Sequence, residues 1–299
     1  LIVSDWEAVQ LLPGNFETQV ATATNAGDDV LLEPEKTADE LAALRKGVAS
    51  QAISSARIDE AVSNILRVKF EMGLFGHTGP VEAAEASIGS PEHRAVAREL
   101  VRKSQVLLKN DAALPLKRDQ HILVAGEHAE DLGLQSGGWT LEWQGFTDNN
   151  RRMPGATTLL DGLKNVAGAD SRIDFDPNGR FAKKTASAAR PADVAVVFVG
   201  EMPYAEWLGD RNAEELNLSA EDHALIARMR PLARKLVLVL VSGRPLILGQ
   251  ALQKSDAIVA AWLSGSEGAG VADVLFGDAP FTGKLPYAWP KDAAGVKPA

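Results

Sequence analysis

The sequence predicts an α/β fold in which a mostly parallel sheet is covered by helices on both faces. Short runs of Val, Ile and Leu alternate along the chain with longer segments of helical character, and this alternation is typical of parallel sheets. The runs are strongly apolar, as expected for strands that are buried on both faces. The 299 residues, of which 45% are hydrophobic and 24% charged, have the composition of a globular protein and suffice for two domains.

The first 76 residues are predicted to form two strand–helix units. Residues 1–6 are expected to be a buried strand whose C-terminal end presents Asp5, with Trp6 beside it. The expected elements that follow are a helix at 17–26, a strand at 30–34, and helices at 37–51 and from 55 to about 73–76. Thr37 and Glu40 have the spacing of a capping box. Because two such units leave most of their strand surface uncovered, residues 1–76 are expected to belong to a larger sheet.

Residues 77–90 contain Gly, Pro, Ala and Glu without a period and are predicted to be a linker. Residues 91–299 are predicted to form a second, doubly wound domain that starts with a helix over 91–108. The expected strands are residues 122–125, 172–175, 194–199, 236–241 and 257–263, with an edge strand at 283–289. The other expected helices are residues 157–166, 181–189, 220–232, 246–253 and 268–276.

Composition excludes several classes of function. The net charge of −9 and the pI near 5.2 argue against a nucleic-acid partner, because binding to phosphates needs clustered Lys and Arg, and they fit a neutral substrate such as a sugar. The chain has no cysteine, and its five histidines show no metal-binding spacing. The segment Gly265–Gly270 lacks the spacing of a dinucleotide-binding loop. No apolar run approaches the roughly 18 residues of a membrane span. We therefore expect no cofactor, no metal, no nucleic acid and no membrane partner.

Candidate functional residues follow the predicted strands, because ligands of open α/β sheets bind beyond the C-terminal ends of the strands. Four of the six tryptophans and two carboxylates lie in these loops: Trp6, Trp139, Trp143, Trp207, Asp5 and Glu206. An indole next to a carboxylate suits a sugar, since the apolar face of the sugar stacks on the ring and the carboxylate binds hydroxyls or transfers protons. Trp6, Trp139 and Trp143 are therefore candidate substrate-binding residues.

Each of these residues also has a simpler explanation. Asp5 could cap a helix, because Asp is a preferred N-cap residue. Glu206 could be a solvated loop charge, as most Glu side chains are. The tryptophans could pack between domains. The local sequence leaves these alternatives open.

Eight motifs in the same order resemble the β-glucosidases and exo-β-glucanases of glycoside hydrolase family three. They are LIVSDW at 1–6, HRAVARELVRKSQVLLKN at 93–110, LPL at 114–116, GGWTLEWQG at 137–145, VGEMPYAE at 199–206, SGRP at 242–245, AAWLSGSEGAG at 260–270 and GKLPYAWP at 283–290. The resemblance extends over nearly the whole chain. Each motif alone would be weak, whereas eight in order are a strong indication.

The resemblance implies a (β/α)8 barrel joined by a linker to an α/β sandwich domain, with the active site between them. Residues 1–76 would then be strands seven and eight of the barrel with their helices, and residues 91–299 the sandwich. It implies that Asp5 is the catalytic nucleophile and Glu206 the general acid/base. Trp6 and Trp143 would clamp the sugar beyond the cleaved bond. In a retaining glycosidase the two carboxylates lie about 5–5.5 Å apart.

The expected function is therefore that of a retaining exo-acting β-glucosidase that removes terminal β-D-glucose from oligosaccharides or β-glucans, in the periplasm or outside the cell. The family residues that bind the hydroxyls of the terminal sugar belong to barrel strands one to six, which this chain lacks. We expect a complementing polypeptide or a longer parent protein to carry them, and we also consider a homodimer. Leu11 replaces a substrate-contacting Arg of the plant enzymes, and the loop Gly209–Leu218 is longer than theirs. The resemblance therefore leaves open the substrate preference beyond the cleaved bond.

Two other interpretations stay open. A sugar-binding or structural fragment that has lost turnover would bind glucosides without releasing glucose. A flavodoxin-like binding domain would require a phosphate loop after the first sandwich strand, where this sequence has a loop rich in Gly and Trp.

Overall fold

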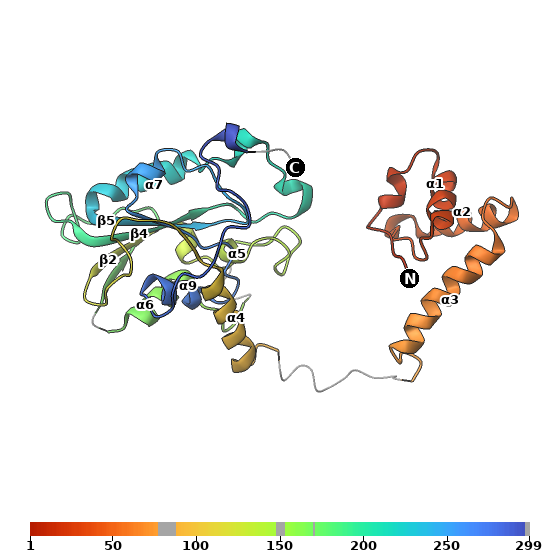
Figure 1. Ribbon diagram of the computed structural model, residues 1–299, viewed down its shortest axis with the longest axis horizontal. Coiled ribbons are helices and arrows are strands. Elements are labelled where there is room, and N and C mark those ends of the chain that lie inside the picture. The colour runs from red at the N-terminus through yellow and green to blue at the C-terminus, as the bar shows by residue number, and fades with distance from the viewer. Residues whose placement is uncertain (77–87, 148–152, 170, 297–299) are drawn as a thin grey trace. The chain divides into compact units, whose positions relative to one another are not determined.

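The computed structural model describes residues 1–76, 88–147, 153–169 and 171–296, and the chain divides into two compact units, Leu1–Glu85 and Ala86–Ala299. Figure 1 colours the first unit red to orange and the second yellow to blue. Residues 77–87 of the predicted linker lie outside the described residues. None of the helices in the described ranges has the length and apolar character that a membrane crossing requires.

The first unit is mostly helical and has a small apolar core. Its elements are the 3-10 helices η1 (Ala8–Leu11) and η2 (Pro34–Lys36) and the α-helices α1 (Phe16–Ala26), α2 (Thr37–Ala49) and α3 (Ser55–Glu71). The side chains of Asn15 and Ser54 accept hydrogen bonds from backbone N–H groups at the start of α1 and α3, as N-cap residues do. The three predicted helices of this unit are confirmed. Its core residues are Val9, Val20, Ala23 and Ala43.

Residues 1–6 differ from the predicted buried strand. Val3 forms a single parallel bridge with Val30, and Leu1, Ile2 and Val3 are 52%, 54% and 48% exposed. A parallel strand buries both of its faces only when other strands flank it and helices cover it. In this unit, residues 29–32 supply the backbone partners of the segment. The predicted pairing direction is therefore found, but the prediction that this segment is buried is wrong for this unit.

The predicted capping box of Thr37 and Glu40 is also wrong. The N-cap residue of α2 is Lys36, whose side chain makes no capping bond, and Thr37 is already helical. The Thr37 hydroxyl donates instead to the Glu33 carbonyl at 3.2 Å. The turn η2 runs directly into α2, and Pro34 at its first position has a φ that is already suited to a helical start.

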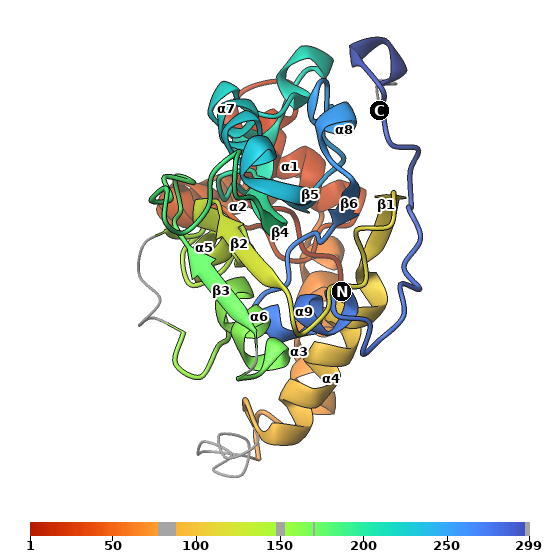
Figure 2. The ribbon, with the colours of Figure 1, turned by 90° about the vertical axis from the view of Figure 1, so that its left-hand side faces the viewer.

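The second unit is built on a six-stranded sheet with the order β1-β6-β5-β4-β2-β3, which Figure 2 shows with β3 at the left and β1 at the right. The strands are β1 (Val106–Asn110), β2 (His121–Ala125), β3 (Arg172–Phe175), β4 (Ala192–Gly200), β5 (Ala233–Val241) and β6 (Ala257–Ala260). Strands β2 to β6 pair in parallel, and β1 pairs antiparallel with β6 at one edge. The predicted α/β fold with a mostly parallel sheet is confirmed.

Helices cover both faces of this sheet. They are α4 (Pro91–Ser104), α5 (Leu132–Ser136), α6 (Leu159–Ala167), α7 (Ala220–Met229), α8 (Ala251–Lys254) and α9 (Gly268–Leu275). Along β4, Val196 faces the core that contains residues of α6 and α9, whereas Val197 faces the core of α7 and α8. Figure 1 shows α7 on one face and α4, α6 and α9 on the other. Each fully buried Val contributes roughly 1.5–3 kcal/mol, which explains why the strands are nearly continuous apolar runs.

The helix predicted over residues 91–108 is α4, but it ends at Ser104 and is followed by strand β1. Gln105 at the junction is fully buried, and its Nε2 donates to the carbonyls of Val101 at 2.9 Å and Ala261 at 3.3 Å. The apolar residues after it fit a helix or a strand equally well, so the pairing with β6 decides between them.

Two other predicted elements are absent. Residues 181–189 form no helix, because Ser187 and Arg190 pair with each other in a tight turn. Residues 283–289 form no edge strand, and Pro286 in their middle has no N–H group to offer a neighbouring strand.

The helix predicted at 246–253 is reduced to α8 at its end. The Ile247 N–H donates to the Leu216 carbonyl at 2.7 Å, which ties this segment to a neighbouring loop. Gly249 has a φ of +48°, in the left-handed region, so the backbone turns before the short helix can begin.

Candidate active site

The candidate site of the second unit lies at the C-terminal edge of the sheet. The chain passes from β2 to β3 on one side and then to β4 on the other, and open α/β sheets bind ligands where the strand order reverses in this way. Two loops at this edge contain predicted site residues. The loop Gly137–Gly145 follows β2 and α5, and the loop Gly200–Gly209 follows β4.

Glu206 is an exposed carboxylate in a strained backbone conformation. It opens the 3-10 helix η6 (Glu206–Gly209) and has a φ of 54°, in the left-handed region that non-glycine residues rarely adopt. Ala205 before it is extended and only 4% exposed. The chain thus leaves the protein interior at Ala205 and turns sharply to present Glu206. Strain of this kind persists only where the surrounding structure holds it.

Three side chains anchor the beginning of this loop. The Nε of Arg244, which follows β5, lies 3.1 Å from Glu201 Oε1 and donates to the Tyr204 hydroxyl at 2.8 Å. The Arg244 guanidinium also lies 4.2 Å from the centre of the Tyr204 ring, within the range of a cation–π contact. Burial raises the pKa of the Glu201 carboxyl, although Arg244 opposes that shift, and burial likewise raises the pKa of Tyr204.

Glycines let the neighbouring backbone approach Tyr204 closely. A Cβ on Gly138 would lie 2.0 Å from the Tyr204 carbonyl oxygen, and a Cβ on Gly209 would lie 2.1 Å from a carbon of its ring. Any side chain at these two positions would displace the loop that carries Glu206.

The loop Gly137–Gly145 carries two of the predicted indoles, Trp139 and Trp143. It contacts the loop that carries Glu206, although the two loops are far apart in the sequence. The Trp143 ring lies 5.4 Å from the Trp207 ring at 63°, an edge-to-face contact, and Trp207 follows Glu206 directly. The backbone N–H of Trp139 donates to the backbone carbonyl of Trp143 at 2.9 Å. Trp139 is 69% exposed and Trp143 41%, so part of each side chain is accessible to a ligand. The side-chain Oε1 of Gln144 accepts a bond of 2.8 Å from the Ala205 N–H, which joins this loop to the Glu206 loop.

Asp5 and Trp6 lie in the first unit. One carboxylate oxygen of Asp5 accepts a bond of 2.7 Å from the backbone N–H of Trp6, and Asp5 is exposed. The residue before the nearest helix, η1, is Glu7, so Asp5 does not have the N-cap position that the simpler explanation required. Trp6 is 65% exposed. Ser4 supports the turn, because its hydroxyl donates to the Asp5 carbonyl and accepts from the Leu32 N–H.

A buried ion pair fixes the segment that leads to Asp5. Asp29 accepts bonds from Arg57 at 2.7 Å, from the Asn64 amide at 3.1 Å and from the Ile2 N–H at 3.1 Å. The hydrogen bond from Arg57 holds the pKa of Asp29 below its usual value. Residues 1–3 are therefore attached to α3 through Asp29, although their own apolar side chains are exposed.

The two units hold different parts of the predicted site. Glu206, Trp139 and Trp143 share the second unit, and Asp5 and Trp6 share the first. Sequence reasoning did not single out Gln144, Tyr204 or Arg244. Tyr204 and Arg244 stand in the motifs VGEMPYAE and SGRP, which was the available signal. No group of three or more His, Asp or Glu side chains within the described ranges is arranged to hold a metal ion.

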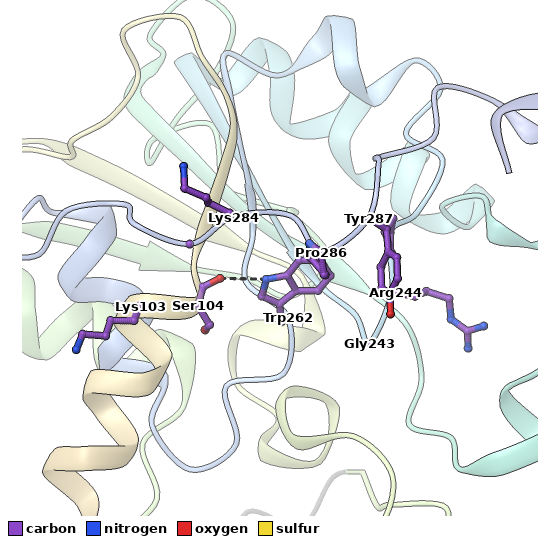
Figure 3. A pocket seen from close by; sticks show the side chains of 10 residues that line it. Lys103, Ser104, Gly243, Arg244, Trp262, Lys284, Pro286 and Tyr287 are labelled. Atoms are coloured by element: carbon purple, nitrogen blue, oxygen red, sulfur yellow. Dashed lines mark hydrogen bonds between the residues drawn. The ribbon is translucent and has the colours of Figure 1, made fainter. Parts of the chain in front are cut away.

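A pocket of about 340 Å³ lies further along the same sheet edge (Figure 3). Trp262, which follows β6, lines it, and its Nε1 donates to the Ser104 carbonyl at 3.1 Å, as the dashed line in Figure 3 marks. Pro286 and Tyr287 also line it, and the guanidinium of Arg244 points away from Trp262. Two of the cations that line this pocket are engaged elsewhere, since Arg244 pairs with Glu201 and Lys103 pairs with Glu99.

Comparison with known proteins agrees with the fold of the second unit. Residues 105–299 match the family model of the glycosyl hydrolase family 3 C-terminal domain. A solved structure of a variant of the exo-1,3/1,4-beta-glucanase from a Pseudoalteromonas species is 40% identical in sequence and superposes with a TM-score of 0.86, covering 97% of this chain and 48% of that one.

Two curated relatives are similar over nearly the whole chain. The periplasmic beta-glucosidase of Salmonella typhimurium is 32% identical over 99% of this chain, which spans 42% of that protein. The lysosomal beta glucosidase of Dictyostelium discoideum is 30% identical over 96% of this chain, which spans 37% of that protein. The chain therefore spans about two fifths of the length of these relatives.

Proposed function

The chain belongs to glycosyl hydrolase family 3, and we propose that it forms the C-terminal part of a retaining exo-acting β-glucosidase that removes terminal β-D-glucose from oligosaccharides or β-glucans. The observation that carries the proposal is the geometry around Glu206. An exposed carboxylate stands at the ligand-binding edge of a parallel sheet, in a strained conformation, with Trp207 as the next residue and the Trp143 ring against Trp207. The β-glucosidase and exo-glucanase names of the relatives support the reaction class.

We assign residues 1–76 to the last two βα units of a (β/α)8 barrel, 77–90 to a linker and 91–299 to an α/β sandwich domain. The parallel bridge between Val3 and Val30 supports this assignment, since a helix follows each bridged segment, as in a barrel. In this arrangement Asp5 stands at the C-terminal end of barrel strand seven, the end at which barrel enzymes place their catalytic residues.

In the proposed mechanism Asp5 attacks the anomeric carbon while Glu206 donates its proton to the leaving oxygen. The bond between that carbon and oxygen breaks, and a glucosyl ester on Asp5 forms. Glu206, now a carboxylate, then removes a proton from water, and the water oxygen replaces Asp5 at the anomeric carbon. Glucose with a retained β configuration leaves, and both carboxyl groups return to their starting states.

We propose that Trp6 and Trp143 clamp the sugar beyond the cleaved bond and that Trp139 extends this aromatic surface. All three indoles are exposed, and an indole offers a sugar ring a broad apolar face. The Trp143 ring packs against Trp207, so it does not have to be ordered at full cost when the substrate binds.

The proposed complete enzyme includes barrel strands one to six, in a longer parent protein or in a complementing polypeptide. We propose a periplasmic or secreted location, which the name of the Salmonella relative supports. The chain alone is expected to hydrolyse no glucoside, and turnover by the 299-residue chain alone would refute this part of the proposal. Sedimentation of the purified complete protein will distinguish a monomer from a homodimer.

A mechanism-based fluorosugar tests the assignment of the nucleophile. The fluorine slows release of the glucosyl ester, so the labelled peptide can be isolated after digestion and identified by mass spectrometry. We expect the label on the peptide that contains Asp5. A label on any other carboxylate would overturn the role of Asp5.

Sugar binding without turnover is the second candidate function. The exposed indoles Trp139 and Trp143 favour it, since they lie in the unit that matches the family model and need no nucleophile to bind a sugar. In that case the complete protein would bind a glucoside in calorimetry but release no glucose on prolonged incubation.

A further inference from the structure

The strained conformation of Glu206 requires contacts that hold it. The Glu201, Tyr204 and Arg244 cluster anchors the start of the loop, but it ends one residue before the buried Ala205. Ala205 has no functional side chain of its own. Its backbone groups must therefore find partners elsewhere if the residue that follows is to keep a left-handed φ of 54°.

Gln144 provides both of those partners. Its side-chain Oε1 accepts from the Ala205 N–H at 2.8 Å, and its Nε2 lies 3.4 Å from the Ala205 carbonyl, to which it donates. The first bond fixes the peptide group between Tyr204 and Ala205. The second fixes the peptide group that contains the nitrogen of Glu206. One primary amide thus sets both peptide planes next to Ala205, from which the orientation of Glu206 follows.

The amide of glutamine is the side chain that this contact needs. A carboxylate of the same length can accept from the Ala205 N–H but cannot donate to its carbonyl, and an apolar side chain can do neither. Gln144 also follows Trp143 directly, and Trp143 touches Trp207 on the other side of Glu206. The two loops are therefore joined on both sides of Glu206.

We propose that Gln144 is a positioning residue for the general acid/base, which holds Glu206 in line with the leaving oxygen without touching the substrate. This inference rests on the function proposed above. It requires that loss of Gln144 impair proton donation selectively, because the Glu201, Tyr204 and Arg244 cluster still holds the start of the loop. A misplacement of about 1 Å can cost a reaction roughly 10²-fold, so the effect should be large enough to measure.

The test compares Gln144→Ala and Gln144→Glu in the longer protein that contains this chain, with Glu206→Ala beside them. Gln250→Ala is the matched control, since Gln250 is exposed on the same unit. Values of kcat/KM are measured for aryl β-glucosides from dinitrophenyl to unsubstituted phenyl, and thermal unfolding is recorded for each variant. Dinitrophenolate leaves without a proton, whereas phenolate needs one.

We expect Gln144→Ala to lose roughly 10- to 100-fold on the phenyl glucoside and less than about threefold on the dinitrophenyl glucoside. The kcat/KM of Gln144→Glu on the phenyl glucoside should lie between that of Gln144→Ala and that of the unchanged protein. If Gln144→Ala does not fold, the Gln144→Glu variant provides the result. Gln250→Ala should change neither rate. An equal loss on both substrates would assign Gln144 a structural role only and would overturn the inference.

The Glu206→Ala variant separates this inference from the proposed function. If the loss of kcat/KM in Glu206→Ala does not depend on the leaving group, the acid/base assignment itself fails. If it shows that dependence while the Gln144 variants behave like the unchanged protein, only the positioning role is refuted.

Discussion

Replacing Arg244 with Met should destabilise the second unit by an amount that depends on pH. Arg244 and Glu201 lie 3.1 Å apart, and their side chains are 21% and 18% exposed. At that distance and an effective dielectric constant of about 20, their attraction is on the order of 5 kcal/mol. Desolvation of both groups offsets about half of it, which leaves roughly 2–3 kcal/mol. The lost hydrogen bond to Tyr204 adds about 1 kcal/mol.

The sign of the pH dependence follows from Glu201. Burial already raises the pKa of its carboxyl above the ordinary 4.5, and removal of Arg244 raises it further. A carboxyl with a raised pKa in the folded state contributes stability below pH 4.5 that is lost as the pH rises through the folded pKa. The penalty of the Arg244→Met variant should therefore be about 3–4 kcal/mol at pH 7 and shrink toward about 1 kcal/mol near pH 4, where Glu201 is mostly protonated in both states.

Thermal unfolding of the complete chain at the two pH values measures this difference. For a unit of this size, about 3–4 kcal/mol corresponds to a lowering of Tm by roughly 6–16 °C. Arg234→Met is the control, because the Arg234 side chain is exposed on β5, the strand that precedes Arg244. The same loss of stability at pH 7 and pH 4 would refute the role assigned to the Arg244–Glu201 pair.

Three further outcomes follow from the site and the core. Glu206→Ala should lower kcat/KM by roughly 10²- to 10⁴-fold for substrates with poor leaving groups and much less for activated aryl glucosides, as steady-state kinetics will measure. Asp5→Asn should lower kcat by roughly 10⁴-fold or more and abolish fluorosugar labelling. Asp273→Asn should destabilise the chain by about 1–3 kcal/mol at pH 7, a range that allows for the partial exposure of its arginine partners. Burial opposes ionisation of Asp273, but bonds from Arg98 and Arg102 hold its pKa below 3.8, so denaturation experiments should show this loss disappear as the pH falls below that pKa.

The sheet of the second unit was predictable because its strands are apolar on both faces. The run Val194–Val199 lies inside β4, and both of its faces are covered by helices, so neither alternation nor a polar edge obscures the pattern. Local propensity failed where long-range contacts decide the structure. The run after Gln105 could have continued α4, and only its pairing with β6, about 150 residues later, makes it a strand.

The same limit separates the predicted site residues from those that were missed. Glu206 and Trp143 stand in motifs with their neighbours, so their place in a loop at the sheet edge could be inferred from sequence. The role of Gln144 depends on a partner 61 residues away, and that of Arg244 on a partner 40 residues away. Nothing in the local sequence distinguishes a glutamine that holds a distant backbone from one that is solvated.

Backbone strain gathers at the edge where the proposed chemistry takes place. Four of the seven non-glycine residues with positive φ in the described ranges follow strands of the second unit at this edge: Trp139, Leu141, Glu206 and Trp262. Each such residue costs on the order of 1–3 kcal/mol, and the cost is tolerated only where other contacts over-determine the conformation. Those contacts are visible here as the Gln144 amide, the Arg244 pair and the glycines around Tyr204. A rigid sheet therefore stabilises a strained set of loops, and the strain presents a carboxylate and its indoles outward, where a substrate can reach them.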